Sequence, residues 1–238
     1  QNVDFGGNPV KSTFSKHIEI PVSGSDVFAP VISTVSLLSV QSYPQSGLFR
    51  EGDRINVLSE ILDGSDKMTR EIMVKNPQGL TFSVPVNLST PVWNGFFERV
   101  EGFWEIAPAV ESGTYTITRF LADDKYGNSS EVILNRSIEV DADYPVAEIF
   151  TPTGVVKGIA DLNIKTFYRH LYNWKLFAST TAELGKLLAQ GETSVEGNVG
   201  AWNTTPEPDG IYTLKLVAKD TVGHETVKTA TAIIDKIP

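Results

Sequence analysis

The sequence contains no cysteine, only three histidines (His17, His170 and His224) and only two methionines among its 238 residues. The absence of cysteine excludes disulfides and thiolate chemistry. No apolar run approaches the roughly 20 residues that a membrane-spanning helix needs. The first residues, QNVDFGGNPV, lack the charged and apolar regions of a signal peptide.

Positive charge is also scarce. The 20 lysines and arginines face 29 aspartates and glutamates, which gives a formal net charge of −9. This balance argues against a phosphate-binding surface for nucleic acid and against docking on anionic lipid. With 41% hydrophobic and 21% charged residues, the composition is that of a folded globular chain of one or two domains.

Short runs of alternating apolar and polar residues dominate the chain. Turn residues separate them every eight to twelve positions, as in RINVLSEI (54–61), TYTITRF (114–120) and YTLKLVA (212–218). This spacing predicts an all-β protein built of sandwiches. Only STTAELGKLLAQ (179–190) suggests a helical turn, and Gly185 weakens that interpretation.

A motif of Asp, two variable residues, Gly, and then Asn or His occurs in DDKYGN (123–128) and KDTVGH (219–224). Each copy follows a strand that begins with a tyrosine, Tyr115 or Tyr212. Such a tyrosine is typical of the tyrosine corner in strand F of immunoglobulin-like sandwiches. The distance from tyrosine to glycine is one residue longer in the first copy, so we expect a bulge near Arg119 or a longer loop at Asp123.

The first 25 residues match the loop and last strand of a third copy, because VDFGGN (3–8) precedes a strand-like run that ends in HIEIPV. We therefore expect the chain to begin inside a hairpin of an incomplete repeat. The predicted boundaries are residues 1–25 for this segment, 26–143 for a first sandwich and 144–238 for a second.

Residues 146–238 resemble an Ig-like module that is repeated in very large secreted or surface proteins of bacteria. The resemblance rests on GVVKGIAD (154–161), WNTT (202–205), PDGIYTLKLVAKDTVGH (208–224) and the closing IID. The chain departs from that pattern at Asn203 and His224, where the family usually has Asp and Asn. Residues 29–143 resemble a related Ig-like or fibronectin-III-like module. The resemblance implies tandem immunoglobulin-like β-sandwiches, and it implies an extracellular or cell-surface location.

Motifs of known enzymes are missing. The sequence has no G-x-S-x-G, no H-E-x-x-H and no P-loop, and we expect surface or packing roles for His17 and His170. The pair Asp63 and Asp66 has the residue types for glycoside hydrolysis, but nothing predicts the cleft that this chemistry requires. We expect no catalysis.

Acidic residues gather where the loops and linkers of the two sandwiches are expected to meet. Oxygen ligands that converge from loops suit Ca²⁺. The candidate ligands are Asp26, Asp63, Asp66, Asp123 and Asp124 in the first module, and Asp141, Asp143, Asp161 and Asp220 in the second. The alternative, which we favour, is that Asp124 and Asp220 bond their own loop backbone while the glycine supplies a positive φ. The two interpretations are compatible.

Aromatic residues allow a second kind of site. Trp93 lies beside Asn94-Gly95 in an expected turn and is the best candidate for an exposed sugar-stacking platform, whereas Trp104 and Trp202 are expected to fill cores. Sequons occur at Asn87, Asn128, Asn135 and Asn203.

The sequence thus predicts non-catalytic spacer modules that hold an adhesive or catalytic domain of the same polypeptide at a distance. One alternative is a carbohydrate-binding or adhesive module that contacts a polysaccharide or a host cell surface. The other is a β-rich filament subunit that associates with itself by strand donation through residues 1–24.

Overall fold

The computed structural model describes residues 27–41, 47–63, 69–88, 92–93, 97–180 and 185–236. All regular structure in this part of the chain is β-strand, so it holds no helix that would cross a membrane. The expected incomplete repeat at residues 1–25 lies outside the described residues, as do Asp26, Asp66 and His17.

The first half of the chain forms two antiparallel sheets. One contains β1 (Val31–Val40), β2 (Arg54–Leu62), β7 (Phe97–Glu105) and β5 (Asn87–Leu88) in that order, and β6 (Val92–Trp93) also pairs with β7. The other has the order β4 (Thr81–Pro85), β3 (Thr69–Lys75), β8 (Gly113–Asp123) and β9 (Ser129–Val140). Together they make one β-sandwich.

The second half repeats this plan. One sheet contains β10 (Val146–Thr151), β12 (Ile159–Phe167) and β15 (Val195–Asn203). The other has the order β11 (Gly154–Val156), β17 (Glu225–Ile234), β16 (Gly210–Asp220), β13 (Leu171–Ser179) and β14 (Lys186–Gly191). The segment that suggested a helical turn therefore ends in a strand.

Each sandwich has its own hydrophobic core. Ile61, Ile72 and Phe120 are fully buried in the first core, and Leu162, Leu176 and Leu214 are fully buried in the second. The two clusters separate between Val140 and Ala147. Trp104 belongs to the first core and Trp202 to the second, as predicted. The alternation of apolar residues in each strand produces this burial, because every second side chain faces inward.

Both tyrosine corners are present. The hydroxyl of Tyr115 donates to the backbone oxygen of Glu111 at 3.2 Å, and that of Tyr212 donates to the backbone oxygen of Pro208 at 3.1 Å. The bulge expected in the first copy is also found, because the register of β8 against β9 shifts between Ile117 and Arg119. The hydroxyl of the bulged residue, Thr118, donates to the backbone oxygen of Met73 at 3.0 Å.

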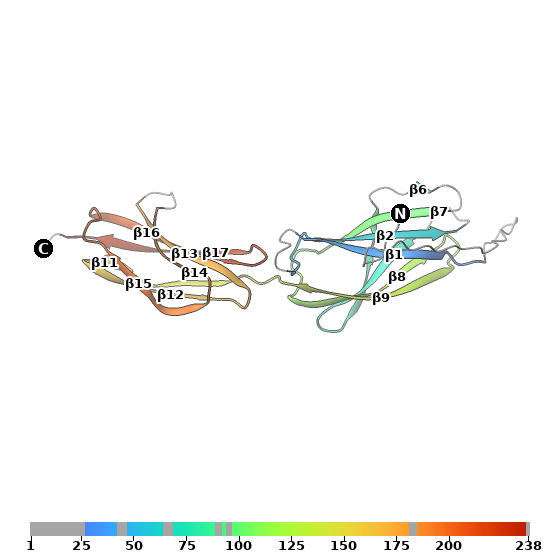
Figure 1. The fold of residues 1–238 in the computed structure, drawn as a ribbon, viewed down its shortest axis with the longest axis horizontal. Helices are drawn as coiled ribbons and strands as arrows, with labels where there is room; N and C mark the ends of the chain where they lie inside the picture. Colours follow the sequence, from blue (N-terminus) through green and yellow to red (C-terminus); the bar gives the residue numbers. More distant parts are fainter. Residues whose placement is uncertain are drawn as a thin grey trace, which may run out of the picture.

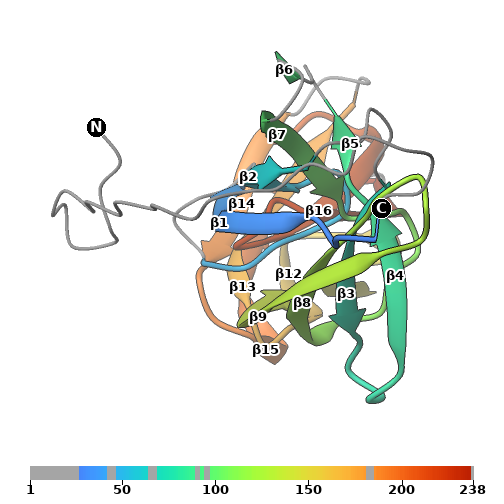
Figure 2. The same ribbon diagram turned by 90° about the vertical axis from the view of Figure 1, so that its right-hand side faces the viewer.

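The two sandwiches lie end to end along one axis, with the short linker after β9 between them (Figure 1). Seen along that axis they overlap (Figure 2). In this arrangement the loops at one pole of the second sandwich face the end of the first, and the outer faces of the sheets in both sandwiches remain open.

Candidate functional site: the joint between the two sandwiches

The repeated motif closes the hairpin between β8 and β9, and again between β16 and β17. Oδ1 of Asp124 accepts the backbone N–H groups of Tyr126 and Asn128, both at 2.8 Å. Oδ1 of Asp220 accepts those of Val222 at 3.0 Å and His224 at 2.8 Å. Gly127 and Gly223 lie at φ angles of 89° and 87°. Since only glycine adopts such angles readily, the spacing from aspartate to glycine is fixed by the turn.

The last residue of the motif binds the second carboxylate oxygen. Nδ2 of Asn128 donates to Oδ2 of Asp124 at 2.6 Å, and Nδ1 of His224 lies 2.9 Å from Oδ2 of Asp220. Asparagine and histidine therefore take the same role in the two copies. Both carboxylates are fully engaged within their own hairpins.

The two aspartates differ in their proton affinity. Burial acts to raise the pKa of Asp124, but hydrogen bonds from Asn128, Tyr126 and Gly127 outweigh it, and the pKa falls below its ordinary value. Burial raises the pKa of Asp220 above its ordinary value, and its bonds to His224 and Val222 offset this only in part. Asp220 is the more deeply buried of the two, at 2% exposed against 7% for Asp124.

Asp141, the first residue after β9, forms the centre of the joint. Its N–H donates to the backbone oxygen of Phe49 at 2.7 Å, which ties it to the first sandwich. Its carboxylate accepts the hydroxyl of Tyr168 and lies 2.8 Å from Nδ1 of His170, both in the loop between β12 and β13 of the second sandwich. The residue is completely buried. One aspartate thus connects the two modules.

Burial and the hydrogen bond to Asp141 raise the pKa of Tyr168 well above its ordinary value, and the charges of Asp143 and Asp220 act in the same direction. The phenol therefore stays protonated and remains a donor at physiological pH.

A ring contact completes the joint. Tyr144 of the linker stacks on His224, with ring centroids 4.5 Å apart and planes inclined by 27°. The N–H of Thr221 donates to the backbone oxygen of His170 at 2.9 Å, which holds the two loops of the second sandwich together. The linker therefore packs against a surface formed by the loop between β12 and β13 and the hairpin between β16 and β17.

The structure separates several of the predicted calcium ligands. Asp161 was expected in the loop between the second and third strands, but this prediction is wrong: it lies in β12, opposite Ala201 of β15. The turn occurs earlier, at Gly158 with φ 72°, so that β12 begins at Ile159 and its following loop contains Tyr168 and His170. Asp161 lies near the start of β12, whereas Asp220 pairs with Leu171, the first residue of β13, just beyond the end of β12; the two aspartates are therefore about one strand length apart.

In the first sandwich, Asp123 ends β8 and accepts a hydrogen bond from Thr69 at 3.3 Å, while Asp63 follows β2. Among the described residues, no three histidine, aspartate or glutamate side chains lie close enough to hold a metal ion. Calcium binding stays a prediction. Trp93 lies in β6, its side chain falls outside the described part of the structure, and sugar binding also stays a prediction.

Sequence reasoning missed the central role of Asp141 and the parts taken by Tyr168, His170 and Tyr144. The available signal was the pairing of DADYP (141–145), at the end of one module, with YRH (168–170), in the loop that faces it. A buried carboxylate requires donors, and Tyr168 and His170 are two of the donors that this loop offers.

No protein-family model and no curated protein matches the chain. Among solved structures, it is similar to a tetra-tandem repeat in the extending region of a large adhesion protein (15% identity, TM-score 0.30, 87% of this chain and 50% of that one). It is also similar to the N-terminal eight Ig domains of Down Syndrome Cell Adhesion Molecule (13% identity, TM-score 0.37, 87% and 25%).

A third similar structure is dimeric latent PorU from Porphyromonas gingivalis (14% identity, TM-score 0.31, 92% and 21%). The chain spans at most half the length of these three structures. At these identities and TM-scores the similarities do not decide its function. The strand order defines the fold: two tandem immunoglobulin-like β-sandwiches.

Proposed function

We propose that the chain is a pair of non-catalytic spacer modules of an extracellular or cell-surface protein, and that the modules hold an adhesive or catalytic domain at a distance. Two separate cores in an end-to-end arrangement support this proposal, because such modules add length without adding a cleft (Figure 1). A spacer also needs a stiff joint, since a freely jointed pair does not keep a fixed reach.

The observation that carries the proposal is the complete burial of Asp141 between the modules. In a freely moving linker, water would solvate this carboxylate. Burying a carboxylate without hydrogen-bonding partners is strongly unfavourable. Here the partners are Tyr168 and His170 of the second sandwich. Opening the joint removes both, so the bonds of Asp141 oppose bending.

The experiment measures the distribution of distances between the modules. Since the chain lacks cysteine, Thr81→Cys in β4 and Thr229→Cys in β17 provide two unique sites for spin labels or dyes, and both residues are exposed. We expect one narrow distribution for this labelled chain and a broader one after Asp141→Ala.

The matched control is Asp143→Ala, which removes an exposed aspartate from the same linker and should leave the distribution narrow. A broad distribution in the chain that carries only the labels, or equal broadening by the two alanine variants, would contradict a stiff spacer.

A further inference from the structure

The aspartate that connects the two sandwiches belongs to a sequence pattern that occurs three times. The pattern is an aspartate followed by a proline three or four residues later, at residues 26–30, 141–145 and 235–238. The second copy begins with the joint residue Asp141, and the aspartate of the first copy lies outside the described residues. The third copy begins with Asp235, directly after the last strand of the second sandwich. Its surroundings can therefore be compared with those of the joint.

At the joint, neighbouring segments on both sides hold the end of β9. Val140, its last residue, pairs with Gly113 at the start of β8, and it also forms a parallel bridge with Phe49. Asp141 comes next, and its carboxylate is covered by the second sandwich. The position of this aspartate therefore follows from the strand pairing of the first sandwich.

The chain leaves the second sandwich in the same way. Ile234, the last residue of β17, pairs with Gly210 at the start of β16, and it also pairs in parallel with Val156 of β11. Asp235 comes next, so it holds the position in the second sandwich that Asp141 holds in the first. The two aspartates differ in burial, because Asp141 is completely buried and Asp235 is exposed.

The residue after each aspartate is tied to the loop that precedes β8 or β16. The N–H of Ala142 donates to Oγ of Ser112 at 2.9 Å, and Nζ of Lys236 donates to the backbone oxygen of Thr205 at 2.9 Å. Both exits are thus anchored on their own sandwich. The backbone at Asp235 is consequently held by the residues on both sides of it.

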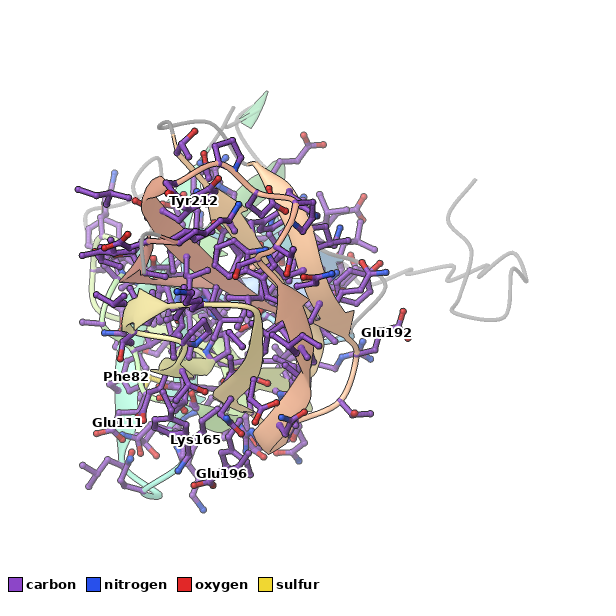
Figure 3. The ribbon with its side chains drawn as sticks, turned by 90° about the vertical axis from the view of Figure 1, so that its left-hand side faces the viewer. Phe82, Glu111, Lys165, Glu192, Glu196 and Tyr212 are labelled. Atoms are coloured by element: carbon purple, nitrogen blue, oxygen red, sulfur yellow. The ribbon has the colours of Figure 1, made fainter. Side chains whose placement is uncertain are left out.

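Apolar side chains are exposed around this exit. Val155 of β11 and Ile211 of β16 lie opposite the same residue of β17, and Ile159 begins β12 at the same pole. Val155, Ile211 and Ile159 are 69%, 65% and 74% exposed. This pole faces the viewer in Figure 3, where Tyr212 near the start of β16 is labelled. Exposed apolar side chains beside an anchored carboxylate are suited to contact another protein module. We call these three side chains and Asp235 the distal pole.

We propose that the distal pole docks a further immunoglobulin-like sandwich, and that Asp235 accepts hydrogen bonds from the loop between the second and third strands of that sandwich. The donors are hydroxyl or imidazole groups, because Tyr168 and His170 supply such groups to Asp141 from the same loop. A carboxylate that becomes buried on docking requires donors of this kind. This inference rests on the proposed function, since it assigns a second stiff joint to the other end of the second sandwich.

The test supplies such a sandwich. In an extended chain, residues 143–236 follow directly after Lys236, so that Asp235 precedes a second copy of the linker and of the second sandwich. The sequence lacks cysteine, and Thr229→Cys in both the resident and the appended sandwich provides two equivalent exposed sites for spin labels. We expect one narrow distribution of distances between the two labels.

Asp235→Ala in the extended chain should broaden this distribution, because the donors of the appended loop lose their acceptor. His170→Ala in the appended sandwich alone should broaden it as well. The two changes together should have little more effect than either one, since both remove the same hydrogen bond. The matched control is Asp143→Ala in the appended linker, which should leave the distribution narrow.

The joint between the first two sandwiches is measured in the same extended chain, with labels at Thr81→Cys and at Thr229→Cys of the resident sandwich. A narrow distribution at that joint together with a broad one at the distal pole overturns this inference and leaves the spacer role intact. Broad distributions at both places overturn the spacer role as well. A narrow distribution at the distal pole that Asp235→Ala does not broaden contradicts the role assigned to Asp235. Calorimetry checks that each variant keeps its folding transitions.

Discussion

The imidazole of His224 lies on the ring of Tyr144, and its Nδ1 atom lies 2.9 Å from the carboxylate of Asp220. One side chain thus closes the hairpin of the second sandwich and supports the linker from the first. In the first sandwich the same position holds Asn128, which closes its hairpin through a hydrogen bond to the carboxylate of Asp124. The difference shows how a repeated hairpin motif is adapted to a place at a joint.

The tyrosine corners give the first prediction. Tyr212→Phe removes one hydrogen bond from a buried hydroxyl and should lower the free energy of unfolding of the second sandwich by about 1 kcal/mol. Calorimetry should show a lower melting temperature for that transition alone. Tyr115→Phe should act in the same way on the first sandwich. A shift of both transitions by either variant would mean that the two cores unfold together.

Alkaline pH should weaken the joint. The pKa of Tyr168 is raised in the folded chain, so its contribution to stability is fully present below the ordinary value of about 10 and is lost as pH rises above that value. We expect the unfolding free energy of the second sandwich to fall as pH increases from about 10 to 11. Tyr168→Phe should reduce this dependence. Absorbance of tyrosinate provides an independent reading, since Tyr115 and Tyr212, whose pKa values are also raised by burial, should ionise after the exposed tyrosines.

The two hairpin aspartates should respond differently to neutralisation. The lowered pKa of Asp124 means that its charge stabilises the folded state above the ordinary pKa of about 4, and that this stabilisation is lost as pH falls through the folded value. The raised pKa of Asp220 has the opposite sign, because the protonated form is favoured in the fold. Asp124→Asn should therefore destabilise its sandwich at neutral pH by more than Asp220→Asn does. Denaturant titration measures both, and a larger loss for Asp220→Asn would show that burial is not the dominant effect there.

Chelation tests whether the chain binds calcium. If the predicted aspartates bind Ca²⁺ where loops and linker meet, calorimetry should show a higher melting temperature with calcium than with a chelator, by mass action on the folded state. The increase should diminish in Asp124→Asn or Asp220→Asn. Identical curves with and without chelator would leave these aspartates with their hairpin role alone.

Much of the fold was predictable because it depends on local rules. Alternation identified the strands, and the positions of Tyr115 and Tyr212 identified strand F in each sandwich. The number of residues between tyrosine and glycine predicted either a bulge near Arg119 or a longer loop at Asp123, and the structure has the bulge, at Thr118. Each of these signals concerns residues close together in sequence, where the two-residue period of a strand fixes which side chains face inward.

The joint was less predictable because it depends on contacts across modules. The sequence marked Asp141 and Asp220 as acidic residues near a linker, and carboxylates near a linker are compatible with either a cation or protein donors. The choice depends on whether Tyr168 and His170 reach Asp141, which follows from the turn at Gly158 and the resulting start of β12. The sequence pattern assigned Asp161 to the loop between the second and third strands, but Asp161 lies just after the turn at Gly158. In the structure that loop follows β12 and contains Tyr168 and His170.

The pairing of β11 with β17 has a mechanical consequence. These strands run parallel, with Gly154, Val155 and Val156 opposite Ala232, Ile233 and Ile234, and they are the second and the last strand of the second sandwich. A pull on the two ends of the module drags the strands past each other lengthwise. The hydrogen bonds between them then carry the load together and must break together, whereas bonds at the end of a hairpin open one after another. A module connected in this way resists stretching more than its small number of paired residues suggests.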